Sequence, residues 1–210
     1  MIVVPDRLNR ALYDGNLSLW WLLSAVLSLW FTVYCGLGIL LGALPPPSSA
    51  PVGPAFALHL VTCGLISWIC IWNLFHTPSH GPLYRSVHKV LGRAAMLSGA
   101  LSASSGFYAA WVERYNPNNV GFSIGISIGG ALQLAAQALG WYYVRQNDIP
   151  KHQVFMSAVF FHGCCIPLWM RFPRFVLDMA IPDWWNGAAV VVAAGIGLLA
   201  LLAQRHKRFL

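Results

Sequence analysis

Residues 84–111 constrain the fold most, because a basic cluster at their start opens directly into a long uncharged run. The charged and ionisable residues of that start are Arg85, His88, Lys89 and Arg93. After them, no charged residue occurs before Glu113. A helix needs about 20 consecutive apolar residues to cross the hydrocarbon core of a bilayer. The stretch therefore predicts a transmembrane helix with one end at each membrane surface.

The composition of the whole chain is typical of a membrane protein. Of its 210 residues, 58% are hydrophobic and 9% are charged, and the charges gather in short clusters between long apolar runs. The formal net charge of +7 does not indicate a nucleic-acid partner, because the basic residues flank apolar spans, where loop topology accounts for them. We therefore expect no nucleic acid among the partners.

Six apolar spans recur along the chain, separated by polar or proline-rich breaks. The expected helices cover residues 17–44, 55–75, 84–111, 120–144, 152–170 and 186–204. Pro167 should kink the fifth span, and residues 171–185 should lie along the membrane surface. The sequence thus predicts an all-α fold, an integral membrane bundle of six transmembrane helices that forms a single domain over residues 1–210.

The orientation of this bundle follows from its Lys and Arg residues. Six crossings place both termini on one side, together with ten of the 13 basic residues. These ten are Arg7, Arg10, Arg85, Lys89, Arg93, Arg145, Lys151, Arg205, Lys207 and Arg208. Arg114, Arg171 and Arg174 lie opposite. Because positive loops stay on the cytoplasmic side, both termini should face the cytoplasm or a matrix-like compartment.

A stripe of small residues predicts how two of the helices pack. Gly121, Gly125 and Gly129 recur every four residues, and the same spacing continues to Gln133 and Gln137. A matching set on the preceding helix consists of Gly92, Gly99, Ala103, Gly106 and Ala110. Small residues let helix backbones approach closely in a membrane, so we expect spans 84–111 and 120–144 to form an antiparallel pair. The two glutamines are either hydrogen-bonding contacts in this pair or ligands of a substrate or quinone.

The sequence argues against several enzyme and transporter classes. No Asp or Glu lies in the middle of an expected span, which disfavours transport through an intramembrane carboxylate relay. Walker, GxSxG and HExxH motifs are absent, and the five cysteines all fall in apolar spans without paired spacing. We therefore expect no disulfide framework and no intrinsic catalytic activity.

Histidines are the remaining residues with chemistry to offer. At a helical rise of about 1.5 Å per residue, two sets lie at matching depths. His59 with His162 falls toward the less charged face, and His88 with His152, or with His76, falls at the basic face. Neutral imidazoles on facing helices are how bundles hold haem iron, so these four, His59, His162, His88 and His152, are candidate axial ligands. The alternative is that they are solvated, bound to headgroups or hydrogen-bonded between helices.

Arg93 is a further candidate for this polar site, because it follows His88 by one turn and a little more. It could supply a fixed positive charge to a haem propionate, a lipid phosphate or a partner carboxylate. The alternative is an arginine that reaches to the membrane surface and only sets topology. His88, Arg93 and His152 are thus the predicted cofactor-binding residues, with b-type haem as the candidate cofactor.

A set of short motifs resembles a known family. The set consists of Leu58-His59, His88-x-x-x-Gly92-Arg93 and Lys151-His152 followed by Met156. It resembles an uncharacterised family of polytopic membrane proteins, a domain of unknown function, with His-Arg-x-x-Gly-Arg and His-Arg-Arg-Trp-Met-x-Arg motifs. The resemblance covers about residues 55–175 and leaves 17–44 and 186–204 as flanking helices. Lys89 and Ala158 stand where the motifs have arginines.

This resemblance implies a polytopic bundle, and the histidine placement alone gives a looser likeness to two-haem transmembrane cytochromes b. Three functions are compatible with the sequence. The first is an accessory or structural subunit of a larger respiratory or photosynthetic electron-transport complex. The second is a b-type haem electron-transfer protein, and the third is a membrane protein that handles lipids or small molecules. The expected partners are membrane lipids and other membrane-protein subunits.

Overall fold

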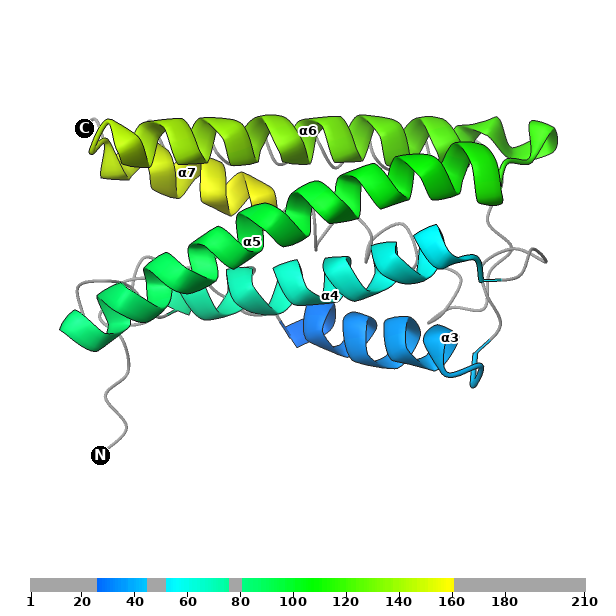
Figure 1. Cartoon of the computed structure of the whole chain (residues 1–210), viewed down its shortest axis with the longest axis horizontal. Coiled ribbons are helices and arrows are strands. Elements are labelled where there is room, and N and C mark those ends of the chain that lie inside the picture. The colour runs from blue at the N-terminus through cyan, green and yellow to red at the C-terminus, as the bar shows by residue number, and fades with distance from the viewer. Residues whose placement is uncertain (1–25, 45–51, 76–80, 161–210) are drawn as a thin grey trace.

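A computed structural model describes residues 26–44, 52–75 and 81–160 of the chain. Every regular element in these ranges is helical, and none is a β-strand, which confirms the predicted all-α class (Figure 1). Several predictions concern residues outside these ranges. They include the kink at Pro167, the interfacial segment 171–185, the span 186–204, both termini, and the residues His76 and His162.

The described helices follow the expected spans closely. The first covers Val26–Leu40, with a π-helical stretch, η1 (Thr32–Leu37), before its short end α3 (Gly38–Leu40). It is followed by α4 (Pro54–Phe75), α5 (Pro82–Tyr108), α6 (Val120–Arg145) and α7 (Ile149–Phe160). The spans predicted over 55–75, 84–111 and 120–144 therefore correspond to α4, α5 and α6. Proline stands in the first turn of α5, where its missing N–H costs nothing.

Beyond Tyr108, α5 continues as a wider, π-helical turn, η3 (Ala109–Glu113). The backbone N–H of Arg114 closes this turn on the carbonyl of Ala109, five residues earlier, at 2.8 Å. A single 3₁₀ turn, η4 (Pro117–Asn119), then leads into α6, and the side chain of Asn116 accepts the N–H of Asn118 at 2.9 Å. The short connection makes α5 and α6 antiparallel neighbours, as predicted.

Among the described helices, two are long and apolar enough to cross a membrane, namely 20 residues over Pro54–Asn73 and 26 over Val120–Arg145. The helix α5 has 27 residues, but its serines and its basic first turns keep it below the same apolar content. The expectation that began with residues 84–111 is thus confirmed as a long helix. Its crossing of a membrane stays a prediction.

In space, α5 lies between α4 and α6, and α7 folds back along α6 (Figure 1). The pairing of α5 with α6 keeps one register along its length. Ser123 donates to the carbonyl of Ala110 at 2.7 Å, and Gln133 donates to that of Gly99 at 3.3 Å. Gln137 donates to the carbonyl of Ala95 at 3.1 Å. Both glutamines are buried, so the interpretation of them as helix-packing contacts is confirmed.

The predicted glycine stripe on α6 is wrong at Gly129. A Cβ added there would meet nothing within 4 Å, whereas one at Gly130 would lie 3.2 Å from Phe107 and 3.6 Å from Ala103. Residues four apart advance about 40° beyond a full turn, so a four-residue stripe drifts around the helix. The face on α5 instead alternates steps of three and four residues. It consists of Ser123, Ile126, Gly130, Gln133 and Gln137.

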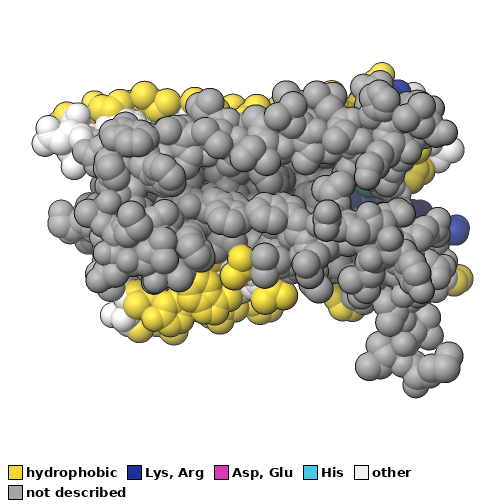
Figure 2. All heavy atoms as spheres, turned by 180° about the vertical axis from the view of Figure 1, so that it is seen from behind, with side chains coloured by type: hydrophobic (Ala, Val, Ile, Leu, Met, Phe, Trp, Pro, Cys, Tyr) yellow, Lys and Arg dark blue, Asp and Glu magenta, His cyan; other side chains and the backbone are white. Residues whose placement is uncertain are grey.

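Small polar residues lie among the helix contacts, and many large apolar residues point outward. The buried hydroxyls of Ser67 and Ser105 bond back to carbonyls four residues earlier, at 2.7 and 2.6 Å. The exposed apolar residues of α4 are Leu58, Val61, Leu65, Trp68 and Trp72. Figure 2 shows hydrophobic side chains along the edges where α6 and α3 lie, and Lys and Arg side chains toward one end. Such an extended exposed apolar surface is unusual for a water-soluble monomer.

Candidate functional site

The structure brings two of the predicted histidines together. His88 lies in the second turn of α5 and His152 in the first turn of α7. Their ring centroids are 6.5 Å apart, and the ring planes are inclined at 73°. The helix α7 packs on α6 and α4 and makes few close backbone contacts with α5. The two imidazoles therefore approach each other between helices whose backbones make few close contacts.

The ring of His152 is held in one orientation by α6. Its Nδ1 atom lies 2.8 Å from the carbonyl oxygen of Gly140. A carbonyl can only accept, so Nδ1 carries the proton and Nε2 keeps its lone pair. Gly140 is buried, and a Cβ there would lie 2.9 Å from the sulfur of Met156. Glycine at this position thus allows α7 to approach the carbonyl that fixes the histidine.

His59 shows the same arrangement on α4. Its Nδ1 lies 2.8 Å from the carbonyl oxygen of Ser102 on α5. The sulfur of Cys63 lies 3.6 Å from Nε2 of His59 and 2.8 Å from the hydroxyl of Ser102. The predicted partner of His59, His162, lies outside the described residues, so the second histidine set stays a prediction.

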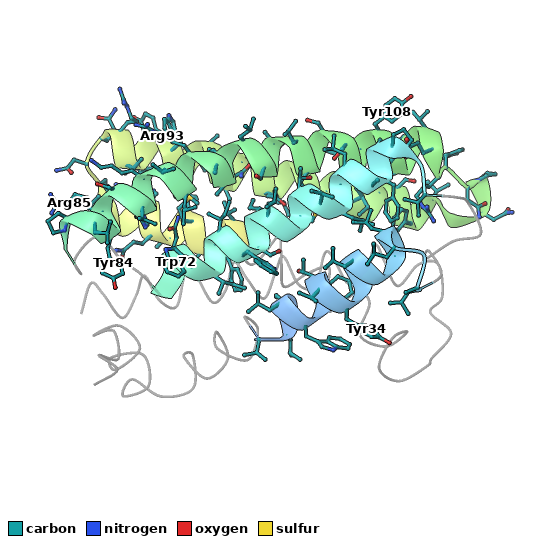
Figure 3. All side chains as sticks on the ribbon, turned by 60° about the horizontal axis from the view of Figure 1, so that its bottom comes forward. Tyr34, Trp72, Tyr84, Arg85, Arg93 and Tyr108 are labelled. Carbon is teal, nitrogen blue, oxygen red and sulfur yellow. The ribbon has the colours of Figure 1, made fainter. Side chains whose placement is uncertain are left out.

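Arg93 lies on α5 but faces outward. Its side chain is exposed and projects from the same end of the bundle as Arg85 (Figure 3). In this placement it does not join the contact between His88 and His152. Of the two interpretations made from the sequence, the arrangement favours the arginine that reaches to the membrane surface.

A contact that sequence reasoning missed lies at the opposite end of the bundle. The carboxylate of Glu113 accepts the backbone N–H of Ala55 at 2.8 Å and that of Phe56 at 2.9 Å. A carboxylate at a helix N-terminus satisfies unpaired N–H groups and opposes the helix dipole. A Cβ at Gly53 would lie 2.6 Å from the same carboxylate, so glycine there leaves room for it. The interaction ties the loop after α5 to the start of α4.

Arg114 strengthens the same junction. It is 6% exposed, and its guanidinium lies 4.3 Å from the centre of the Phe56 ring, in cation–π contact. Burial lowers the pKa of Arg114, and the neighbouring Glu113 acts in the opposite direction. A clue was present in the sequence, because α4 begins at Gly53-Pro54 without a Ser, Thr, Asp or Asn to cap it. An acceptor from elsewhere was therefore needed.

Within the described ranges, no group of three or more His, Cys, Asp or Glu side chains could hold a metal ion. The His88–His152 pair offers two donors, which suits a metal whose other ligands come from a macrocycle, as in haem. Searches for relatives do not add to this picture, since no family model, curated protein or solved structure matches the chain. The family resemblance of the motifs stays a prediction.

Proposed function

We propose that the chain is an integral membrane protein with six transmembrane helices and with both termini on its positively charged side. The exposure of large apolar side chains supports this proposal. Several serines and both Gln133 and Gln137 are buried between helices, whereas many leucines and tryptophans face outward. In lipid, apolar residues gain nothing by turning inward, and small or hydrogen-bonding residues provide the helix contacts. The two helices long enough to cross a bilayer agree with it.

Within this bundle, the proposed activity is electron transfer by a b-type haem held between His88 and His152. The observation that carries it is the 6.5 Å separation of the two ring centroids. A metal–imidazole bond is about 2 Å long, so two imidazoles that share one metal ion have centres roughly 6–7 Å apart. The fixed Nδ1–H of His152 leaves Nε2 to act as the ligand, in the way that metal-binding histidines are usually oriented. The donor set thus fits the group.

His88 and His152 are the residues that would hold the group, and the chemistry that a haem would supply there is one-electron transfer. The carbonyl of Gly140 on α6 orients the ring of His152, and α4 packs against both α5 and α7, which carry the two histidines. No proton transfer by the protein is required.

The visible spectrum of the purified full-length chain tests this proposal. We expect haem absorption bands that sharpen on reduction, and we expect His88→Ala and His152→Ala each to remove the bands of one haem. His206→Ala, in the basic tail, is the matched control and should keep the full spectrum. A wild-type protein without haem bands, produced with sufficient haem supply, would rule the proposal out.

A second candidate function is that of an accessory subunit in a larger membrane complex. The exposed stripe of α4, which runs from Leu58 to Trp72 in steps of three and four residues, favours it. Such a regular apolar seam suits a neighbouring transmembrane helix as well as lipid. Co-purifying subunits that are lost in the double variant Leu65→Ala/Trp68→Ala, with unchanged helix content, would support this function. A chain that purifies alone from its native membrane would contradict it.

A further inference from the structure

Asn73, in the last turn of α4, carries a buried side-chain oxygen that lacks a hydrogen-bond partner in the described part of the chain. Within the described part of the chain, its side-chain oxygen Oδ1 is inaccessible to solvent and has no hydrogen-bond partner. A buried acceptor left unsatisfied costs about 1–3 kcal/mol. An asparagine held at this cost near the candidate site calls for a specific explanation.

The position of Asn73 connects it to the histidine pair. Its amide nitrogen lies 4.0 Å from the point where a Cβ on Gly92 would be. Gly92 follows His88 by four residues on α5, so the two share one face of that helix. The helix α4 also packs on α7, which carries His152. Asn73 thus lies on the helix that packs against those of both histidines, beside the α5 face that carries His88.

His152 and His59 show what an acceptor from another helix does for a histidine in this bundle. In both, Nδ1–H donates to an acceptor from another helix, the carbonyl of Gly140 for His152 and that of Ser102 for His59. An acceptor on Nδ1 fixes the tautomer and ring orientation of a metal-binding histidine and raises its basicity. A side-chain amide oxygen can serve in place of a backbone carbonyl, because both are neutral sp² acceptors.

We propose that Asn73 is a positioning residue for His88. Its Oδ1 accepts a hydrogen bond from Nδ1–H of His88, and this bond leaves the lone pair on Nε2 of His88 available for a metal. Asn73 lies beside Gly92, one helical turn after His88, and this places the amide near the imidazole that it orients. The inference deepens the haem proposal and rests on it for its purpose. The tautomer that it predicts exists in the haem-free protein as well.

The decisive experiment is NMR of the full-length chain labelled with ¹⁵N-histidine, purified without haem and placed in lipid nanodiscs. The wild type should show His88 with its proton on Nδ1. Asn73→Leu should shift His88 toward the Nε2–H tautomer and leave His152 unchanged. Asn73→Asp, which keeps an oxygen acceptor, should restore the Nδ1–H form. Gln133→Leu, which removes another buried amide of the bundle, is the matched control and should have no effect on His88.

The haem-loaded protein gives a second measurement. Loss of the acceptor makes the imidazole a weaker donor to ferric iron, so Asn73→Leu should raise the midpoint potential and Asn73→Asp should lower it. An Nε2–H tautomer in wild-type His88, or an Nδ1–H tautomer that Asn73→Leu does not change, overturns the role of Asn73. A chain that takes up no haem when haem is supplied, but whose His88 tautomer depends on Asn73, overturns the haem proposal alone. If Asn73→Leu does not fold, the wild-type tautomer and the Asn73→Asp variant still decide.

Discussion

Gly106 on α5 lies directly against the imidazole of His59 on α4. A Cβ added at Gly106 would come within 2.8 Å of Nδ1 of His59, the atom that donates to the carbonyl of Ser102. The absence of a side chain on one helix is therefore what allows the histidine of the next helix to reach its acceptor. The packing of α4 on α5 and the orientation of His59 depend on the same glycine.

Replacing this glycine should disturb both. Gly106→Val is expected to destabilise the bundle by about 1–3 kcal/mol, because the ring must shift and the helices must separate. Reversible unfolding in mixed detergent micelles measures the change. Gly129→Val is the matched control. It adds the same side chain at a position on α6 where a Cβ would meet nothing within 4 Å. Equal losses in the two variants would show that helix propensity rather than contact sets the cost.

The amide of Gln137 should not tolerate a carboxylate. It is 2% exposed and donates through Nε2 to the carbonyl of Ala95. Gln137→Glu removes the donor and places two oxygens against that carbonyl, so we expect a loss of about 3 kcal/mol or more at neutral pH. Gln146→Glu, at an exposed position after α6, should change stability little. Unfolding curves recorded side by side decide, and similar midpoints would contradict the buried contact.

The N-terminus of α4 should depend on Glu113. Glu113→Ala is expected to cost about 1–2 kcal/mol, because two backbone N–H groups lose their acceptor. Hydrogen exchange at Ala55 and Phe56 should become faster, while exchange in the middle of α4 changes less. In Glu113→Gln one acceptor oxygen remains, so an intermediate effect is expected. Unchanged protection at both amides in Glu113→Ala would refute the capping role.

The membrane topology can be tested at the two ends of α6. Single cysteines at Asn118 and Gln146, in a variant whose five native cysteines are replaced by serine, stand in exposed positions before and after that helix. We expect a membrane-impermeant maleimide to label Asn118→Cys from one side of sealed vesicles only and Gln146→Cys from the other. A cysteine added to the basic C-terminal tail should behave like the one at position 146. Labelling of positions 118 and 146 from the same side would exclude a membrane-crossing α6.

The helices and the histidine pair could be predicted from the sequence for definite physical reasons. Apolar runs bounded by proline, glycine and charge determine the helices, and short loops force neighbouring helices to be antiparallel. His88 and His152 both begin helices at the basic end, so this topology alone brings them to one end of the bundle. Their contact at 6.5 Å required the structure, because the rotation of each helix about its axis does not follow from its position in the chain.

The rotation of each helix about its own axis also explains which contacts were predicted wrongly or were missed. A repeat of four residues suggested that Gly129 contacts α5. The residue in contact is Gly130, because the contacting residues of packed helices are spaced alternately by three and four. Glu113 was interpreted as a charge at the water boundary, since a residue 58 positions from Ala55 gives no local sign of capping it. Arg93 was placed near the histidines by spacing; its side chain is exposed, and its role stays a prediction.

Because of the π-helical turn η3, the number of residues between α5 and η4 determines where the side chains of Glu113 and Arg114 point. An α-helical turn advances about 100° per residue, and the wider turn that Arg114 closes on Ala109 accommodates one residue more. That added residue rotates the end of the helix so that Glu113 reaches the amides of α4 while Arg114 covers Phe56. Deleting Ala110 would leave a continuous helix with both side chains turned away. A chain shorter by one residue could therefore keep all its helices and still lose the junction between α4 and the loop after α5.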